Sequence, residues 1–435
     1  MANNGFSTHG RRVAIVDGAR TPFARAWTYF KDLSSVDLGA AAVNALLERS
    51  ELDAAEVDQL IFGCVAAPPN GPHVGREVVF RSELPSSVPA ATVQFYCASS
   101  ARATVDAANE IALGHADVVV AGGVESLSEN QVLFSKKFTH ALQGASKARS
   151  LGKRLGAFKG ISFADVKPEV PGINEPTTGK SMGQHAELMA KDMGIPRREQ
   201  DAWALESHRR AAAAYDAGFL QDQVCTMHIP PHFEEPLDRD TDVRAETDLE
   251  KLSKLRPVFD REYGTVTAGN ASPLTDGAAA VLLMSEDKAK ALGYEPLAYI
   301  RSYATAAIDI QKEHLLLGPT YSAPIAFERA GMTLSDMDLV EMHEAFASQV
   351  LATLVRFESQ DHADALGLSE PIGTVDRDKL NPNGGSIAMG HPFGATGARV
   401  IGQAAHEMAR RELGTGFVSI CAGGGLGFSM VLERI

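Results

Sequence analysis

The sequence of 435 residues contains little cysteine, and none of it in a metal-binding spacing. Its four cysteines form no CxxC pair and no Cys/His cluster; they are Cys64, Cys97, Cys225 and Cys421. This argues against disulfides and structural zinc, so we expect a reducing compartment, the cytoplasm. The histidines form no pair of metal-ligand spacing either, and we therefore predict no metal.

Long apolar runs and an excess of positive charge are also absent. No stretch of 18 apolar residues occurs, so we expect no membrane-spanning helix. The first 12 residues resemble neither a secretory signal nor a typical transit peptide, and the last three are not a peroxisomal signal. The formal net charge of -14 argues against nucleic acid as a partner, because binding phosphates needs a basic face.

Strand and helix patterns alternate along much of the chain. Strands are predicted at 13–16, 59–65, 91–97 and 117–126, with helices from Asp37 and over 98–114. A second unit begins near Leu297, with a helix over 323–331, a strand running into a helix from 338, and a closing strand pair in 416–434. The alternation predicts an α/β fold with a largely parallel sheet, and the length predicts two or three domains.

The pattern is interrupted between residues 129 and 256. Residues 135–159 contain no acidic residue but seven basic ones, which are Lys136, Lys137, Lys147, Arg149, Lys153, Arg154 and Lys159. We predict that 129–256 is inserted into a first domain made of 1–128 and 257–292, and that 293–435 is the second domain. The basic stretch is either an interaction surface or simply a solvated face.

Cys97 lies where an apolar segment runs into a helix rich in small residues. Free N–H groups and the dipole at a helix start favour thiolate, so we predict a lowered pKa and a nucleophilic role. A small buried packing residue is the alternative. Cys64 and Cys225 have no such setting, and we assign both to packing.

Two glycine-rich turns and a short motif carry further candidates. His391, in GGSIAMGHPFGATGAR (384–399), can accept a thiol proton. In CAGGGLG (421–427) the glycines bring N–H groups toward a reacting carbonyl and leave the Cys421 sulfur exposed; a purely structural turn is the alternative. His343, in HEAF, is either a group that binds water or an oxyanion, or a solvated helix-capping histidine. Two thiols and an imidazole together suit making or breaking a carbon–carbon bond next to a thioester.

The chain resembles the thiolase family over essentially its whole length. The motifs appear in order as RTPFARA, GGVES, MGQHAE, NASPLTDGAAAV, HEAFA, GHPFGATGAR and CAGGGLG. The resemblance implies the thiolase fold, with two duplicated halves in a five-layered αβαβα arrangement and a loop domain inserted in the first half.

The resemblance also implies a role for each site residue. Cys97 becomes acylated, His391 activates it and helps form the first oxyanion hole, and Cys421 protonates the acetyl-CoA carbanion or removes the α-proton in reverse. The backbone N–H groups of Cys97 and Gly423 stabilise the acyl-enzyme carbonyl. The residues that line the coenzyme A (CoA) tunnel are Ser272, Met182 and Phe346.

His343 stands where most thiolases have asparagine. HEAF is similar to the thiolase subunits of fatty-acid oxidation complexes, the trifunctional-enzyme β-subunit type. This implies ping-pong cleavage of 3-ketoacyl-CoA, with CoA as a substrate and no dissociable cofactor. It also implies a homodimer or homotetramer, either alone or bound to a hydratase/dehydrogenase α subunit, with the inserted region on that partner or on a membrane surface.

Other functions remain open at this point. A biosynthetic acetyl-CoA acetyltransferase shares the fold, and so does a condensing synthase, although a decarboxylating synthase has no need of a second thiol such as Cys421. A non-catalytic acyl-CoA carrier or assembly subunit is a third possibility, against which the intact set of Cys97, His391 and Cys421 argues. The sequence favours no particular length of the substrate's acyl chain and neither direction of the reaction.

Overall fold

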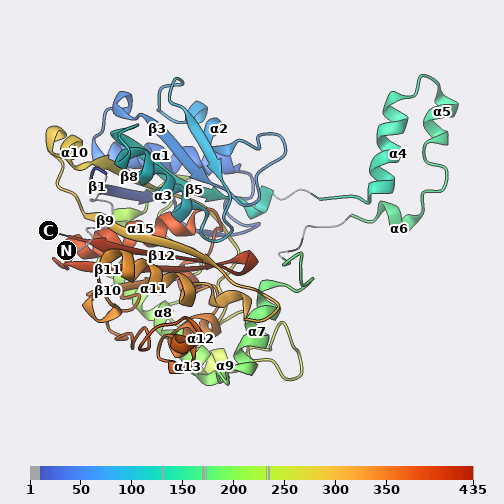
Figure 1. Ribbon diagram of the computed structural model, residues 1–435. Coiled ribbons are helices and arrows are strands. Elements are labelled where there is room, and N and C mark those ends of the chain that lie inside the picture. The colour runs from blue at the N-terminus through green and yellow to red at the C-terminus, as the bar shows by residue number, and fades with distance from the viewer. Residues whose placement is uncertain are drawn as a thin grey trace.

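The computed structural model describes residues 10–129, 132–168, 172, 174–231, 233 and 236–434. It has two α/β halves stacked on one another, with the inserted residues reaching outward and around the second half (Figure 1). The first half contains β1 (Val13–Arg20), β2 (Ala24–Arg25), β3 (Gln59–Gly63), β4 (Ala90–Val93), β5 (Val118–Glu125) and β8 (Thr275–Ser285), with α1 (Ser35–Ser50), α2 (Val74–Arg81), α3 (Ser99–Ala112) and α10 (Glu286–Leu292).

The second half repeats this plan. Its strands are β9 (Ala298–Ala307), β10 (Leu339–Met342), β11 (Thr415–Ala422) and β12 (Leu426–Glu433). Its helices are α11 (Pro319–Ala330), α12 (Ala347–Phe357), α13 (Gln360–Ala365), α14 (Ser386–Met389) and α15 (Thr396–Arg410). The two sheets meet where β1 pairs with β9, so the strand order runs continuously as β10-β11-β12-β9-β1-β8-β5-β3-β4.

The sheet is mixed, and the expectation of a largely parallel sheet is wrong. Only β3–β4, β3–β5 and β10–β11 pair in parallel among the described strands. The turn Gly423–Gly425 joins β11 to β12, and three residues are too few for the crossover that parallel strands need. After the insertion, β8 enters between β1 and β5 and runs antiparallel to both.

The three largest hydrophobic clusters of the described residues lie between five layers. The middle core contains α3 and α15 between the inner faces of the two sheets, while α1 and α2 cover the outer face of the first sheet and α11 and α12 that of the second. Small residues let the two central helices approach closely, because a Cβ on Gly397 would lie 2.4 Å from the backbone N of Ala101. Strands β5 and β8 are buried at every position, as expected of interior strands.

The inserted residues separate into two parts. Helices α4 (Lys136–Lys147), α5 (Leu151–Gly156) and α6 (Phe163–Val166) project from the body, and we call residues 132–168 the arm (Figure 1). Helices α7 (Met182–Asp192), α8 (Arg197–Asp216) and α9 (Leu249–Ser253), with the short pair β6 (Met227–His228) and β7 (Pro236–Leu237), belong to the rest. Of these, α7 and α8 lie against the second half. Among the described residues, no helix is both long and apolar enough to cross a bilayer.

Candidate active site

Cys97 is held in a tight turn between β4 and α3. The Ser99 hydroxyl accepts a hydrogen bond from the backbone N–H of Phe95 (2.8 Å) and donates to the carbonyl of Tyr96 (2.7 Å). Tyr96 has a left-handed backbone, with φ 48°, which turns the chain just before the cysteine. Cys97 therefore lies two residues before the first residue of α3, as the sequence indicates.

His391 is carried by a turn that requires glycine. Gly390 has φ 107°, and a Cβ there would lie 2.5 Å from the Thr275 side chain. The backbone N–H of His391 donates to the carbonyl of Pro273 (3.2 Å), and that of Gly394 donates to Oε2 of Glu125 (2.9 Å). The turn is thus hydrogen-bonded to the segment just before β8 and to the end of β5.

His343 follows β10 directly and is fully buried, at 0% exposure. Its backbone N–H donates to the carbonyl of Ser419 in β11 (2.9 Å). Its ring lies next to that of His391, with the ring centroids 4.1 Å apart. The alternative of a solvated capping histidine is therefore wrong.

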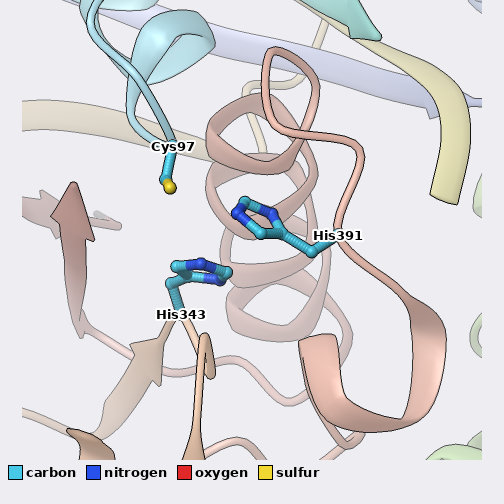
Figure 2. Close-up of side chains that lie close together, drawn as sticks. All are labelled: Cys97, His343 and His391. Carbon is cyan, nitrogen blue, oxygen red and sulfur yellow. The ribbon is translucent and has the colours of Figure 1, made fainter. Parts of the chain in front are cut away.

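Three side chains from distant parts of the sequence converge on one space. Cys97 Sγ and a ring nitrogen of each of His343 and His391 all lie within 4.8 Å of one another (Figure 2). The Nε2 atoms of both rings are buried and have no hydrogen-bond partner in the described part of the chain. One sulfur and two imidazole nitrogens at this spacing are also ligands that zinc accepts. The absence of a metal therefore stays a prediction.

Cys421 and the glycine turn complete this space from the second half. Cys421 is the next-to-last residue of β11 and is only 1% exposed. It packs in a cluster with Phe346 and Leu316, so the expectation of an exposed sulfur is wrong. The turn at Gly424 and Gly425, with φ 72° and 70°, folds β12 back so that Cys421 pairs with Gly427. The backbone N–H groups of Gly423 and of Cys97 itself both point to the Cys97 sulfur.

Burial controls the protonation of the site. It raises the pKa of the Cys97 thiol to about 12, outweighing the two N–H groups, so the expected lowering by the helix start is wrong. Burial and the nearby Arg399 cation lower the pKa of His391 to about 3, and burial also lowers the pKa of His343 well below its usual value. Burial raises the pKa of Cys421 as well. At rest the site holds neutral thiols and neutral imidazoles, and the attacking sulfur must lose its proton during the reaction.

The three predicted tunnel residues lie beside the Cys421 side of the site. The Ser272 hydroxyl donates to the carbonyl of Ala345 (3.0 Å), within the HEAF motif. Met182, at the start of α7, packs in the same cluster as Phe346 and Cys421.

A neighbouring cavity of about 530 Å³ was not predicted from the sequence. Pro273, whose carbonyl binds the backbone of His391, lines it, and so does Ile387. Three cationic side chains also line it, namely Arg25, Arg244 and Lys251, together with the carboxylates of Glu246 and of Asp242, which pairs with Arg25. They come from β2 and from the insertion, so only the folded chain brings them together.

Two buried carboxylates support the site and had been given no role. Glu125 accepts N–H groups from Val65 (3.1 Å) and Ala66 (2.8 Å) as well as from Gly394. Glu344 accepts from the Ser207 hydroxyl in α8 (2.7 Å) and from the backbone N–H of Ile387 (3.2 Å). Both lie within motifs quoted above, GGVES and HEAF, which was the available signal.

A duplicated five-layer fold with a cysteine at a central helix start and a histidine on a GHPFG turn defines a class of acyl-transfer enzymes. The family model described as Thiolase, N-terminal domain matches residues 13–287, and Thiolase, C-terminal domain matches 294–434. The chain belongs to the thiolase family, and the predicted thiolase fold is confirmed.

Similar proteins carry more specific names. The chain is 48% identical over 428 residues to the 3-ketoacyl-CoA thiolase of Shewanella pealeana, covering 98% of each chain. It is 49% identical over 425 residues to that of Aeromonas salmonicida, covering 98% of this chain and 97% of the relative. Human mitochondrial 3-ketoacyl-CoA thiolase has a similar structure, with a TM-score of 0.82, 32% identity, and coverage of 98% and 99%. The structure of Bacillus anthracis acetyl-CoA acetyltransferase is also similar, with a TM-score of 0.83 and 31% identity. The match covers 99% of this chain and 100% of that one.

Proposed function

We propose that this protein is a 3-ketoacyl-CoA thiolase of fatty-acid β-oxidation, cleaving its substrate with CoA to acetyl-CoA and a shortened acyl-CoA. The observation that carries the proposal is the convergence of Cys97, His343 and His391 within 4.8 Å, with Cys421 buried beside them. The names of the bacterial relatives, at 48% and 49% identity, support the same substrate class.

In the first half-reaction, Cys97 gives its proton to Nε2 of His391 while its sulfur attacks the C3 carbonyl of the substrate. The backbone N–H groups of Cys97 and Gly423 stabilise the oxyanion on C3. The C2–C3 bond then breaks, and its electron pair goes to the acetyl-CoA enolate, whose oxygen lies toward His343 and protonated His391. Cys421 protonates C2, and acetyl-CoA leaves.

In the second half-reaction, the thiol of free CoA gives its proton to the Cys421 thiolate. The CoA sulfur attacks the acyl group on Cys97, and the same two N–H groups stabilise the new oxyanion. When the carbon–sulfur bond to Cys97 breaks, the departing sulfur recovers its proton from His391. Every proton is thereby returned, which fits a ping-pong cycle without a dissociable cofactor.

We place CoA in the cavity of about 530 Å³, with its phosphates toward Arg25, Arg244 and Lys251. Its pantetheine would run past Ser272, Met182 and Phe346 toward Cys97. The wall formed by Pro273 supports this path, because the Pro273 carbonyl holds the turn that carries His391.

The insertion at 129–256, between a first domain of 1–128 with 257–292 and a second of 293–435, is proposed to carry the interaction surfaces. A homodimer or homotetramer is proposed, with the arm bound to a hydratase/dehydrogenase α subunit. All seven basic side chains of the arm are exposed, together with several large apolar ones. The four free cysteines support a cytoplasmic location.

The test of function combines turnover with trapping of the acyl-enzyme. The purified protein is mixed with CoA and either acetoacetyl-CoA or a long-chain 3-ketoacyl-CoA, and acetyl-CoA release is followed. In parallel, radiolabelled acyl-CoA is added without free CoA, and peptides are mapped for label on Cys97, with Cys97→Ser as the control. A protein that cleaves neither substrate and retains no label would refute the proposal. Cleavage of acetoacetyl-CoA alone would favour the acetyltransferase instead.

A further inference from the structure

The two histidines of the site present the same ring atom to the same space but have different partners behind them. Nδ1 of His391 lies 2.7 Å from the Thr396 hydroxyl, and Nδ1 of His343 lies 2.8 Å from the Ser386 hydroxyl. A neutral imidazole carries one proton, so the group at Nδ1 determines whether Nε2 is a donor or an acceptor.

Behind His391, the hydroxyl of Thr396 has a backbone carbonyl to bond. Thr396 is buried, and its Oγ1 lies 3.2 Å from the carbonyl of Pro392, to which it can donate. With its single proton directed to that carbonyl, the hydroxyl accepts toward His391. Nδ1 of His391 therefore carries the ring proton, and Nε2 presents a lone pair to Cys97, as a general base must.

Behind His343 the situation is reversed. Ser386 is buried, and its Oγ accepts a hydrogen bond from Nη2 of Arg399 (2.6 Å). A guanidinium only donates, so the Ser386 proton remains free to be donated to Nδ1 of His343. Nδ1 is then the acceptor, and Nε2 of His343 carries the ring proton into the site.

We propose that Ser386, backed by Arg399, is a positioning residue that fixes His343 as a hydrogen-bond donor while Thr396 fixes His391 as the base. This rests on the proposed thiolase function and adds a division of labour within it. His343 donates from Nε2 to the enolate oxygen of the departing acetyl-CoA in the first half-reaction. Burial keeps both rings neutral at rest, so tautomer rather than charge distinguishes them before substrate reacts.

The division predicts which step depends on Ser386. Carbon–carbon cleavage forms an enolate and needs the His343 donor. Exchange of an acyl group between acyl-CoA and free CoA passes through the same acyl-Cys97 but forms no enolate, and its oxyanion is stabilised by backbone N–H groups. Loss of the Ser386 hydroxyl should therefore affect cleavage and spare exchange.

The first experiment measures the tautomers directly in the wild-type enzyme. The protein is labelled with ¹⁵N-histidine, and the ring signals are assigned by comparison with His343→Asn and His391→Asn. We expect the proton on Nε2 of His343 and on Nδ1 of His391. Finding it on Nδ1 of His343 would overturn the proposal, and the tautomer itself is read from the wild-type protein.

The second experiment compares Ser386→Ala with wild type in both reactions. Thiolysis of a 3-ketoacyl-CoA should fall about 10- to 100-fold, less than the roughly 10²- to 10³-fold for deleting an oxyanion donor outright, because His343 itself remains. Exchange of radiolabelled CoA into acyl-CoA should change less than about twofold. Ser386→Cys, which restores a weak donor, should recover part of the loss. The control is Ser302→Ala, which removes another buried hydroxyl, one that donates to the carbonyl of Ala326 (2.7 Å).

Equal loss of both reactions in Ser386→Ala would mean that Ser386 acts only through structure, which would overturn the proposal. A wild-type protein without exchange would refute the thiolase function itself, and the ¹⁵N spectrum would still decide the tautomers. The two failures are therefore distinguishable.

Discussion

The resting protonation of Cys97 and His391 predicts how the sulfur reacts with pH. The pKa of Cys97 is raised to about 12 and that of His391 lowered to about 3, so the imidazole is already unprotonated above about pH 4. Alkylation of Cys97 by iodoacetamide should then be nearly independent of pH between about 6 and 8, because the same base serves throughout.

His391→Asn supplies the comparison for this prediction. Without the imidazole, the alkylation rate should fall about 100-fold at neutral pH and rise with pH, since solvent hydroxide must remove the proton. The rate is measured by mass spectrometry of the Cys97 peptide. A wild-type rate that climbs tenfold for each pH unit would contradict the role of His391 as base.

Cys421 is predicted to protonate the substrate carbon C2 and to take no part in forming the acyl-sulfur bond on Cys97. Cys421→Ala should lower thiolysis about 10²- to 10⁴-fold, the range for loss of a general acid, while acyl-CoA still labels Cys97. Cys225→Ala is the control, because Cys225 is also a free thiol but packs against the outer core of the first half. Full thiolytic turnover by Cys421→Ala would exclude the proposed mechanism.

At the scale of single turns, Glu125 connects three segments around the His391 turn. Its Oε2 accepts from Val65 and Gly394, and its Oε1 accepts from Ala66. An amide has only one oxygen, so Glu125→Gln points its NH₂ group at one or more of these donors. We predict that the His391 turn shifts and that kcat falls about 10- to 100-fold while KM changes little.

Glu129→Gln provides the control for the Glu125 variant. Glu129 also accepts from a backbone N–H and a hydroxyl, both of Ser35 (2.9 and 2.8 Å), and a glutamine oxygen can serve both. Steady-state kinetics with acetoacetyl-CoA and CoA, together with thermal melting, compare the two variants. Equal kcat in both would show that Glu125 does not position the turn.

The sequence predicted the bounds of helices and strands better than the burial and the pKa of single side chains. Helix α3 was expected over 98–114 and lies at Ser99–Ala112, since its apolar periodicity is local. The predictions of a lowered pKa for Cys97 and of an exposed sulfur for Cys421 were wrong. Both properties depend on neighbours that are far away along the chain. Ser386 and Thr396 were quoted only as letters of a motif, since a hydroxyl's direction is determined by partners that the fold supplies.

For the whole chain, too, local features were predicted better than those that depend on distant neighbours. The five layers followed from a resemblance across many ordered motifs, while strand direction did not, because a mixed sheet and a parallel sheet leave similar apolar patterns. The basic stretch could not be assigned from composition alone. In the structure it belongs to an arm that extends from the body, and this permits a test on the assembled protein (Figure 1).

The arm is predicted to bind a partner through its exposed apolar side chains. Leu151, Leu155 and Phe163 are 73%, 67% and 92% exposed, so changing all three to serine should alter the melting temperature by less than about 2 °C and leave thiolysis unchanged. Association with a hydratase/dehydrogenase subunit, measured by co-purification and light scattering, should be lost, because these side chains would supply the apolar centre of the interface. Leu113→Ser is the control, as Leu113 is also 67% exposed but ends α3 on the body. Loss of binding to anionic vesicles instead would identify a membrane contact, and unchanged behaviour in both assays would exclude a docking role for these side chains.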